Sequence, residues 1–223
     1  MITTSLIANI CAGGLLLSTF LMISKVRLVP MIRYYILAAV CLAGLGVSVT
    51  VADGLMERLI APLATLLFKA IIIPAIVIHT ARRLPIANQL RMSIRPAGTS
   101  LLFLLVLALS AFIVRGLPET LGLMLFTNAI SREVLFISVA LILTGAMFLV
   151  IRQDLFSQIF GLLTIENGIA SFGLVALEST PIIMELGIFL IIAGSIVVMA
   201  VLTDQVHAEY ETVDTRKLKE LTD

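Results

Sequence analysis

The sequence predicts an all-α membrane protein, a polytopic bundle of about seven transmembrane helices with its N-terminus outside and its C-terminus in the cytoplasm. The composition is the first reason. Of the 223 residues, 60% are hydrophobic and 13% are charged, whereas a soluble domain has about 45–50% apolar and about 25% charged residues. The second reason is that long apolar runs recur along the chain. The third is that basic residues gather in alternate connections between these runs.

The apolar runs define the expected helices. A helix that crosses the hydrocarbon core of a bilayer needs roughly 20 mostly apolar residues. The runs that meet this requirement are 2–24, 34–55, 59–80, 98–116, 133–151, 155–177 and 181–203. The first run opens without a basic residue, and a secretory signal normally begins with one. We therefore interpret it as a retained span.

The basic residues predict the orientation, because cytoplasmic connections are rich in lysine and arginine. Most of the 15 basic residues fall in one set of alternate segments: Lys25, Arg27, Arg33, Arg82, Arg83, Arg91, Arg95, Arg152, Arg216, Lys217 and Lys219. The other set holds only Arg58, Arg115 and Arg132, and Lys69 lies within a span. We therefore expect the first set in the cytoplasm.

The chain divides at its longest connection, RRLPIANQLRMSIRPAG, residues 82–98. Residues 1–97 form an N-terminal three-helix part, and 98–132 hold the fourth helix and a connection. Residues 133–203 form a second three-helix part, and 204–223 are a charged tail. The basic connection is either a docking surface for cytoplasmic partners or anionic lipid, or a topology signal alone.

Glu166 is the most informative residue, because it is the only charged residue in the run 155–177. It lies roughly 16 Å into the span at 1.5 Å per residue, close to the middle of the bilayer. A carboxylate there costs on the order of 2.5–3.5 kcal/mol and usually faces a bundle interior or a water-filled path. Asn167 adds a polar group, and Gly161 allows close helix approach. We predict a proton or ion path at Glu166; the alternative is a structural carboxyl paired across helices.

Lys69 is the second intramembrane charge, at the centre of the third span. A lysine at the midpoint is about 15 Å from either surface, so it should face protein or water. Pro74 lacks an N–H and leaves the carbonyl of Ala70 without its helical partner, which favours a kink. We predict a relay role for Lys69; the alternative is a static ion pair with an acid on another subunit. His79, near the cytoplasmic end, is either a proton-uptake group or an interfacial histidine with no specific role.

Glu185 is the third candidate for the polar path. Thr180 and Pro181 are typical of a helix start, which places Glu185 about one turn inside the outer end. An acid near a helix N-terminus is also favoured by the helix dipole, so a structural role stays open. The remaining charges at span ends are expected to be ordinary solvated groups: Asp53, Glu57, Glu119, Arg132, Glu133 and Asp154.

Other functional classes lack support in the sequence. Cys11 and Cys41 form neither a CxxC nor a metal-ligand cluster, and His79 and His207 mark no metal site. No phosphate-binding glycine motif occurs, and a net charge of +1 does not favour nucleic acid. We expect no catalytic residue, no metal and no cofactor in this chain.

Two segments carry a resemblance to known families. The last three spans, with RQDLFSQIFGLLTIENGIASFGL around Glu166 and TPIIMELGIFLIIAGSI around Glu185, are similar to the K-type subunit of respiratory complex I and Mrp-type antiporters. The whole length resembles the hydrogenase-4 component E family of formate hydrogenlyase-type and related group-4 hydrogenases. LLFKAIIIP around Lys69 and LLTIENGI around Glu166 carry that second resemblance.

The resemblance implies a non-catalytic subunit in the membrane arm of a complex I-like hydrogenase. Its partners would be antiporter-like membrane subunits and a peripheral nickel–iron arm with iron–sulfur subunits, in a bacterial or archaeal plasma membrane. The polar residues would couple redox energy to proton or sodium movement. The alternatives are a structural membrane anchor, an Mrp-type cation/proton antiporter subunit or a free-standing transporter. No inverted repeat that would favour the last of these is evident.

Overall fold

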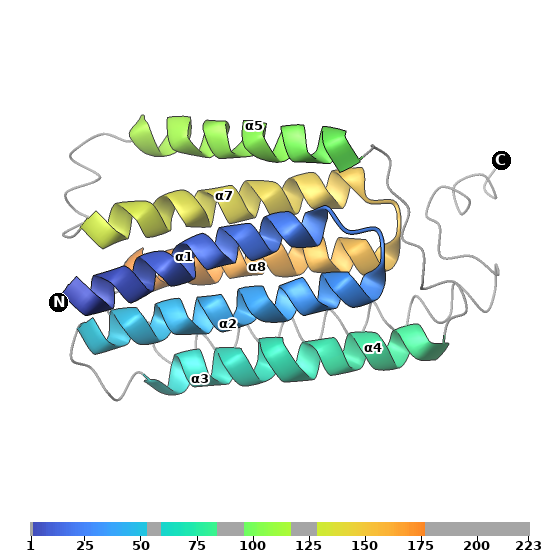
Figure 1. The fold of residues 1–223 in the computed structure, drawn as a ribbon, viewed down its shortest axis with the longest axis horizontal. Helices are drawn as coiled ribbons and strands as arrows, with labels where there is room; N and C mark the ends of the chain where they lie inside the picture. Colours follow the sequence, from blue (N-terminus) through green and yellow to red (C-terminus); the bar gives the residue numbers. More distant parts are fainter. Residues whose placement is uncertain (1, 53–58, 84–95, 117–128, 177–223) are drawn as a thin grey trace.

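The computed structural model describes residues 2–52, 59–83, 96–116 and 129–176, and these form helices, with short turns at 24–27 and 152–154. Within them the chain has no β-strand, so the predicted all-helical fold is confirmed. The helical elements lie side by side along the long axis of the molecule (Figure 1). They are α1 (Ile2–Ile23), α2 (Leu28–Ala52), α3 (Ile60–Leu67), η2 (Phe68–Ile72), α4 (Ile73–Arg83), α5 (Pro96–Arg115), α7 (Ala129–Ile151) and α8 (Leu155–Ala176).

Among the described residues, five helical stretches are long and apolar enough to cross a membrane: Leu6–Ile23, Leu28–Val51, Pro62–His79, Gly98–Arg115 and Arg132–Ile151. They overlap the first five predicted spans. The predicted start of the second span at 34 was too late, because α2 begins at Leu28 and includes Arg33. The predicted run 155–177 forms α8, a 22-residue helix that carries Gln158, Glu166 and Asn167. The seventh predicted run and the tail lie outside the described residues. The count of seven and the orientation therefore stay predictions.

Two helical hairpins form the centre of the bundle. α1 packs along α2, and α7 packs along α8. The hairpins contact each other through α1 with α7 and through α2 with α8. The element α3–η2–α4 lies against α2 on one side, and α5 lies against α7 on the other (Figure 1). The helices of the two sequence halves are thus interleaved and do not form separate bundles.

The buried apolar side chains form two clusters, one toward each end of the bundle. The first gathers where α1 ends and α2 begins, and includes Tyr35, Phe160 and Leu163. The second lies toward the start of α1, includes Leu15, Leu42 and Leu141, and has Ala170 of α8 packed against it. Along α8, Glu166 and Asn167 fall between Leu163 and Ala170. A polar layer therefore lies between two apolar layers.

The α7–α8 hairpin depends on close approach of two backbones. A Cβ atom on Gly145 would lie 2.6 Å from the carbonyl oxygen of Gly161, and one on Gly168 would lie 2.8 Å from that of Ser138. Real Cβ atoms do not come this close to backbone oxygens, so only glycine fits. Small residues at such crossings are typical of membrane helix pairs. Gly161, predicted to have a structural role, lies at this crossing.

The third predicted span is not one regular α-helix. A π-helical turn, η2, separates α3 from α4, and the N–H of Ile73 donates to the carbonyl of Phe68, five residues earlier. Pro74 follows this turn directly. Since proline cannot donate to the carbonyl four residues before it and its ring crowds that carbonyl, a wider turn is a common adjustment. Lys69 lies within the π-helical turn and is buried.

Candidate functional site: a buried ion pair between the two sequence halves

Lys69 and Glu166 form an ion pair in the interior of the bundle. The Lys69 ammonium contacts the Oε2 atom of Glu166 and donates a hydrogen bond of 2.7 Å to Oδ1 of Asn167. Lys69 is 0% exposed, Glu166 4% and Asn167 1%. An unpaired charge at this depth would be expensive, and pairing with hydrogen bonding is the usual way such a charge is tolerated.

The local helix geometry explains why these three side chains meet. Glu166 and Asn167 are neighbours on α8, so one side chain on a facing element can reach both. The π-helical turn supplies that side chain, because it widens the helix at Lys69 just before Pro74. π-helical turns inside α-helices occur frequently at functional sites. The amine and its two partners therefore connect a helix of the N-terminal half with a helix of the C-terminal half.

Tyr35 of α2 lies beside this pair, and the sequence analysis did not single it out. Its side chain is 0% exposed, and its ring contacts that of Phe160 of α8 with 5.6 Å between centroids. The Tyr35 phenol and the Glu166 carboxylate interact electrostatically. Within the described residues the Tyr35 hydroxyl has no hydrogen-bond partner. A buried phenol usually has a hydrogen-bond partner. The Tyr35 hydroxyl is therefore available to donate a hydrogen bond to the nearby Glu166 carboxylate.

A second buried group of charges lies at the α7–α8 turn. The Nη2 atom of Arg152 donates to the carbonyl of Ile23 at 2.8 Å and also to the carbonyl of Lys25. Its guanidinium stacks on Phe148, 4.9 Å from the ring centroid. Asp154 accepts a 2.7 Å hydrogen bond from the N–H of Ser157, which caps the start of α8. Arg152 therefore joins the α7–α8 turn to the α1–α2 turn.

Burial perturbs both groups at this turn, which lies outside the helical spans. Desolvation lowers the pKa of Arg152 to about 10, although the neighbouring Asp154 opposes the shift. Desolvation also raises the pKa of the Asp154 carboxyl, against the opposing effects of the Ser157 hydrogen bonds and of Arg152. The expectation that Asp154 is an ordinary solvated charge was wrong, because the turn is covered by the α1–α2 connection and leaves it 8% exposed.

The other predicted site residues lie elsewhere. His79 is exposed near the end of α4, about 15 Å along the helix from Lys69, so the structure does not bring it to the ion pair. Glu185 lies outside the described residues. Arg132 and Glu133, expected to be solvated, are exposed at the start of α7. Among the residues that the structure describes, no three His, Cys, Asp or Glu side chains are grouped to hold a metal ion.

Sequence signals found the pair and missed its surroundings. Glu166 and Lys69 stand out as charges within apolar runs. Tyr35 gives no such signal, because a tyrosine near a span end is also typical of the membrane interface. Arg152 lies in a connection that was predicted to be cytoplasmic, so its charge is already explained by the orientation of the chain. Only the contact between the two turns reveals that it is buried.

Comparison with known proteins extends the resemblance over the whole chain. The chain is 24% identical to hydrogenase-4 component E of Escherichia coli K12 over 98% of this chain and 99% of that protein. Hydrogenase-4 component E of Shigella flexneri matches with the same identity and coverage. An uncharacterized protein of Mycobacterium tuberculosis is 25% identical over 98% of this chain and 97% of its own length. No protein-family profile and no solved structure matches the chain.

These similarities confirm the predicted resemblance to hydrogenase-4 component E. The matches run from end to end, so the chain is homologous to those proteins in both sequence halves. The pairing of Lys69 in the first half with Glu166 in the second is consistent with a single unit of that length. The narrower similarity of the last three spans to the complex I K-type subunit stays a prediction.

Proposed function

We propose that this chain is a membrane subunit of a complex I-like hydrogenase, and that the Lys69–Glu166 pair is a proton-transfer site in its membrane arm. Homology to hydrogenase-4 component E supports the first part. The second part rests on one observation, a fully buried lysine that contacts a buried glutamate at mid-helix. Such residues within a membrane-spanning bundle are expensive and typically belong to ion pathways.

The proposed step is a change of protonation within the pair. When a proton binds the Glu166 carboxylate, the ion pair becomes an ammonium beside a neutral acid, and their Coulomb attraction is lost. Asn167 continues to accept from the Lys69 ammonium in both states, since its oxygen already lies 2.7 Å away. Release of the proton to the other side restores the ion pair. No covalent bond other than O–H is made or broken, and the pair titrates as a unit.

Tyr35 would act as a positioning residue in this step. Its hydroxyl has no hydrogen-bond partner within the described residues, and it interacts electrostatically with the Glu166 carboxylate. A modest rotation of the carboxylate away from Lys69 would let the phenol donate to it. This gives the carboxylate a second position in which it stays hydrogen-bonded, as a buried polar group requires.

The proposed ion is the proton and not sodium. A sodium ion would need the carboxylate oxygens as ligands, because hard cations bind oxygen. In this site the Lys69 ammonium already contacts a carboxylate oxygen of Glu166. A bound cation would have to displace a charged side chain inside the bundle, whereas a proton only neutralises its partner.

In the assembled enzyme the redox chemistry would belong to other chains. The proposed partners are a peripheral nickel–iron arm with iron–sulfur subunits and antiporter-like membrane subunits, in a bacterial or archaeal plasma membrane. The five helical stretches long enough to cross a bilayer support the membrane location. The chain would receive redox energy as a conformational or electrostatic change at the Lys69–Glu166 pair.

A glutamine at position 166 tests this proposal. Glu166→Gln keeps the shape and a hydrogen-bonding group but cannot carry the proton. In membrane vesicles with the complete hydrogenase complex, we expect hydrogen evolution to persist while proton movement falls about tenfold or more, since positioned acid–base groups contribute ~10²–10⁴ to rates. Thr144→Val is the matched control, because it removes a buried hydroxyl from α7, whereas Lys69, Glu166 and Asn167 belong to η2 and α8.

A structural anchor is the competing function, and one observation favours it. Lys69 bonds both Glu166 and Asn167, as a lock between helices would. Under that hypothesis Glu166→Gln reduces the amount of assembled complex on native gels, and the complexes that do assemble move protons normally. Unchanged proton movement in assembled Glu166→Gln complexes would remove the pair from the pathway.

A further inference from the structure

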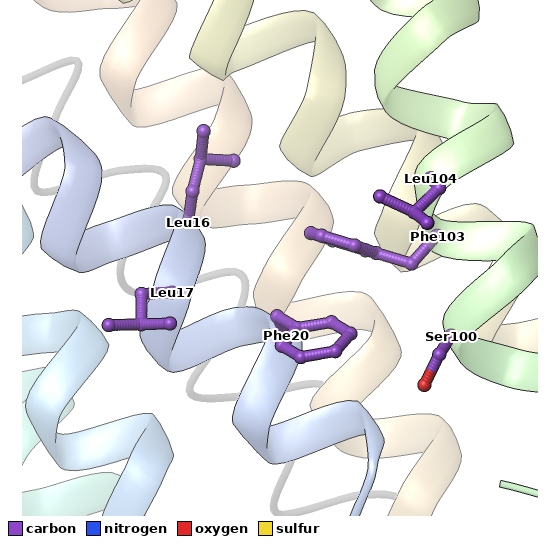
Figure 2. A pocket seen from close by; sticks show the side chains of 6 residues that line it. All are labelled: Leu16, Leu17, Phe20, Ser100, Phe103 and Leu104. Carbon is purple, nitrogen blue, oxygen red and sulfur yellow. The ribbon is translucent and has the colours of Figure 1, made fainter. Parts of the chain in front are cut away.

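Two hollows lie between α1 and α5, away from the ion pair. The first, of about 350 Å³, is lined by Leu16, Leu17, Phe20, Ser100, Phe103 and Leu104. Leu16, Leu17 and Phe20 come from α1, and Ser100, Phe103 and Leu104 come from α5 (Figure 2). The second hollow, of about 810 Å³, reaches the helix ends and includes Asn9, Arg115, Arg132 and Glu133.

The two hollows adjoin at Leu16, which lines both, and we treat them together. Among the described helices, α5 packs mainly against α7 and touches α1 at few points, so these helices leave the groove between α1 and α5 uncovered. At its deep end the rings of Phe20 and Phe103 close it, with centroids 5.0 Å apart. Leu17 and Leu104 on its rim are 59% and 61% exposed. We call this feature the α1–α5 groove.

The dimensions of the groove match one leaflet of a bilayer. From Asn9 to Phe20 along α1 the distance is about 16 Å at 1.5 Å per residue, and half of the hydrocarbon core is about 15 Å. The polar lining lies where α5 ends at Arg115 and α7 begins, which is where the membrane surface would be. The apolar lining extends from there toward the middle of the bilayer.

The charges at the polar end of the groove indicate which kind of lipid headgroup would fit there. Arg115 and Arg132 supply two guanidinium groups, and guanidinium is the side chain best suited to bind a phosphate. Glu133 reduces their combined charge to one positive unit and can accept hydrogen bonds from hydroxyl groups. Asn9 adds an amide that donates and accepts. This end therefore complements a singly negative phosphodiester with a hydroxyl-bearing headgroup.

We propose that the α1–α5 groove binds one anionic phospholipid of the phosphatidylglycerol type. The phosphate lies between Arg115 and Arg132, the glycerol hydroxyls lie near Glu133 and Asn9, and one acyl chain runs past Leu16 to the Phe20–Phe103 pair. The bound lipid fills the space between α1 and α5 and holds α5 to the bundle. This site is independent of the proton step at Glu166.

Native mass spectrometry of the purified complex tests the headgroup. After delipidation, we expect phosphatidylglycerol to be retained and phosphatidylcholine, which has no net charge, to be lost at the same detergent concentration. The double variant R115Q/R132Q should retain about tenfold less phosphatidylglycerol, whereas Arg33→Gln, which removes an exposed arginine of α2, should retain the wild-type amount. Equal retention of both lipids, or wild-type retention by R115Q/R132Q, would overturn the proposal.

A photo-crosslinking amino acid at Leu17 identifies what occupies the groove. Leu17 lies on the rim and is more than half exposed, so the probe reaches the occupant without disturbing the buried wall. We expect a lipid adduct in the intact complex, and its loss in R115Q/R132Q. An adduct with another polypeptide, or with a distant segment of this chain, would show that protein fills the groove and would refute lipid binding.

Discussion

Within the described residues, charge is buried in two places, and the two sites differ in what the charge contacts. At mid-helix, the Lys69 ammonium contacts the Glu166 and Asn167 side chains. At the α7–α8 turn, the Arg152 guanidinium donates to backbone carbonyls of the α1–α2 turn. Side-chain partners can rotate or change protonation, whereas backbone carbonyls are fixed by the helices that end there.

The side-chain chemistry of Arg152 and Lys69 differs in the same way as their contacts. Arginine stays charged at any physiological pH and presents a planar set of donors, which suits it to hold carbonyls in place. Lysine carries its charge on a flexible stem and exchanges protons more readily when buried. The contacts of Arg152 join the α7–α8 turn to the α1–α2 turn, and the mid-helix pair is where the proposed change of charge would occur.

Replacement of Lys69 should have the largest effect on stability. Lys69→Met leaves the buried Glu166 carboxylate without its ion partner, and breaking a buried pair in this way costs about 3–5 kcal/mol. Thermal unfolding of the purified complex should show a large loss. Adding Glu166→Gln should recover much of that stability, because it also removes the uncompensated charge. A double variant as unstable as Lys69→Met would mean that the two side chains do not depend on each other.

Replacement of Arg152 should weaken the fold without uncoupling the enzyme. Arg152→Ala removes two hydrogen bonds from a charged donor, each worth about 1.5–3 kcal/mol, so we expect a loss of about 3 kcal/mol. Complexes that still assemble should move the wild-type number of protons per hydrogen molecule in vesicles. A changed number of protons per hydrogen molecule would show that Arg152 also takes part in proton movement and is not only structural. Arg152→Lys should recover less than half of the stability, because lysine lacks the forked donors.

Tyr35→Phe separates the proposed positioning role from a packing role. The change removes a buried hydroxyl that has no hydrogen-bond partner in the described part of the chain, so stability should stay the same or rise by about 1 kcal/mol. Proton movement should nevertheless fall severalfold in vesicles, and its pH profile should shift, because the Glu166 carboxylate loses its second partner. Unchanged proton movement with raised stability would assign Tyr35 to packing alone.

Asp154→Asn should give the smallest effect, visible in its pH dependence. Burial raises the pKa of native Asp154 above the ordinary value of 3.8, so the native state binds that proton more tightly than the unfolded chain. Its stabilising contribution is complete below about 3.8 and is lost as pH rises through the native pKa. The variant lacks this titration. As pH rises from about 4 to 7, the native protein should therefore lose about 1 kcal/mol or less of unfolding free energy relative to the variant, as measured by thermal unfolding at each pH.

Part of the candidate site could be predicted from the sequence, namely its two charged residues but not their contact. Glu166 and Lys69 can be identified because a charge within an apolar run has few physical explanations. Their contact cannot be predicted, since Lys69 and its partner Asn167 are 98 positions apart, and helices of similar length and hydrophobicity can pack in several arrangements. The π-helical turn at Lys69 is a local response to Pro74, yet the sequence indicated only a kink.

Composition, run length and charge placement by themselves determined that this is an all-helical membrane protein with Lys69 and Glu166 inside its spans. Those properties follow from the free-energy cost of placing polar groups in hydrocarbon. This cost depends only on the residues of each segment and not on how the segments pack. Tertiary structure alone decided that α3–η2–α4 and α8 both contact α2, which brings Lys69 to Glu166. It also decided that Arg152 and Asp154 are buried while Arg115 and Arg132 share one groove. These depend on which helix faces which, a choice made by close packing at positions such as Gly145 and Gly168.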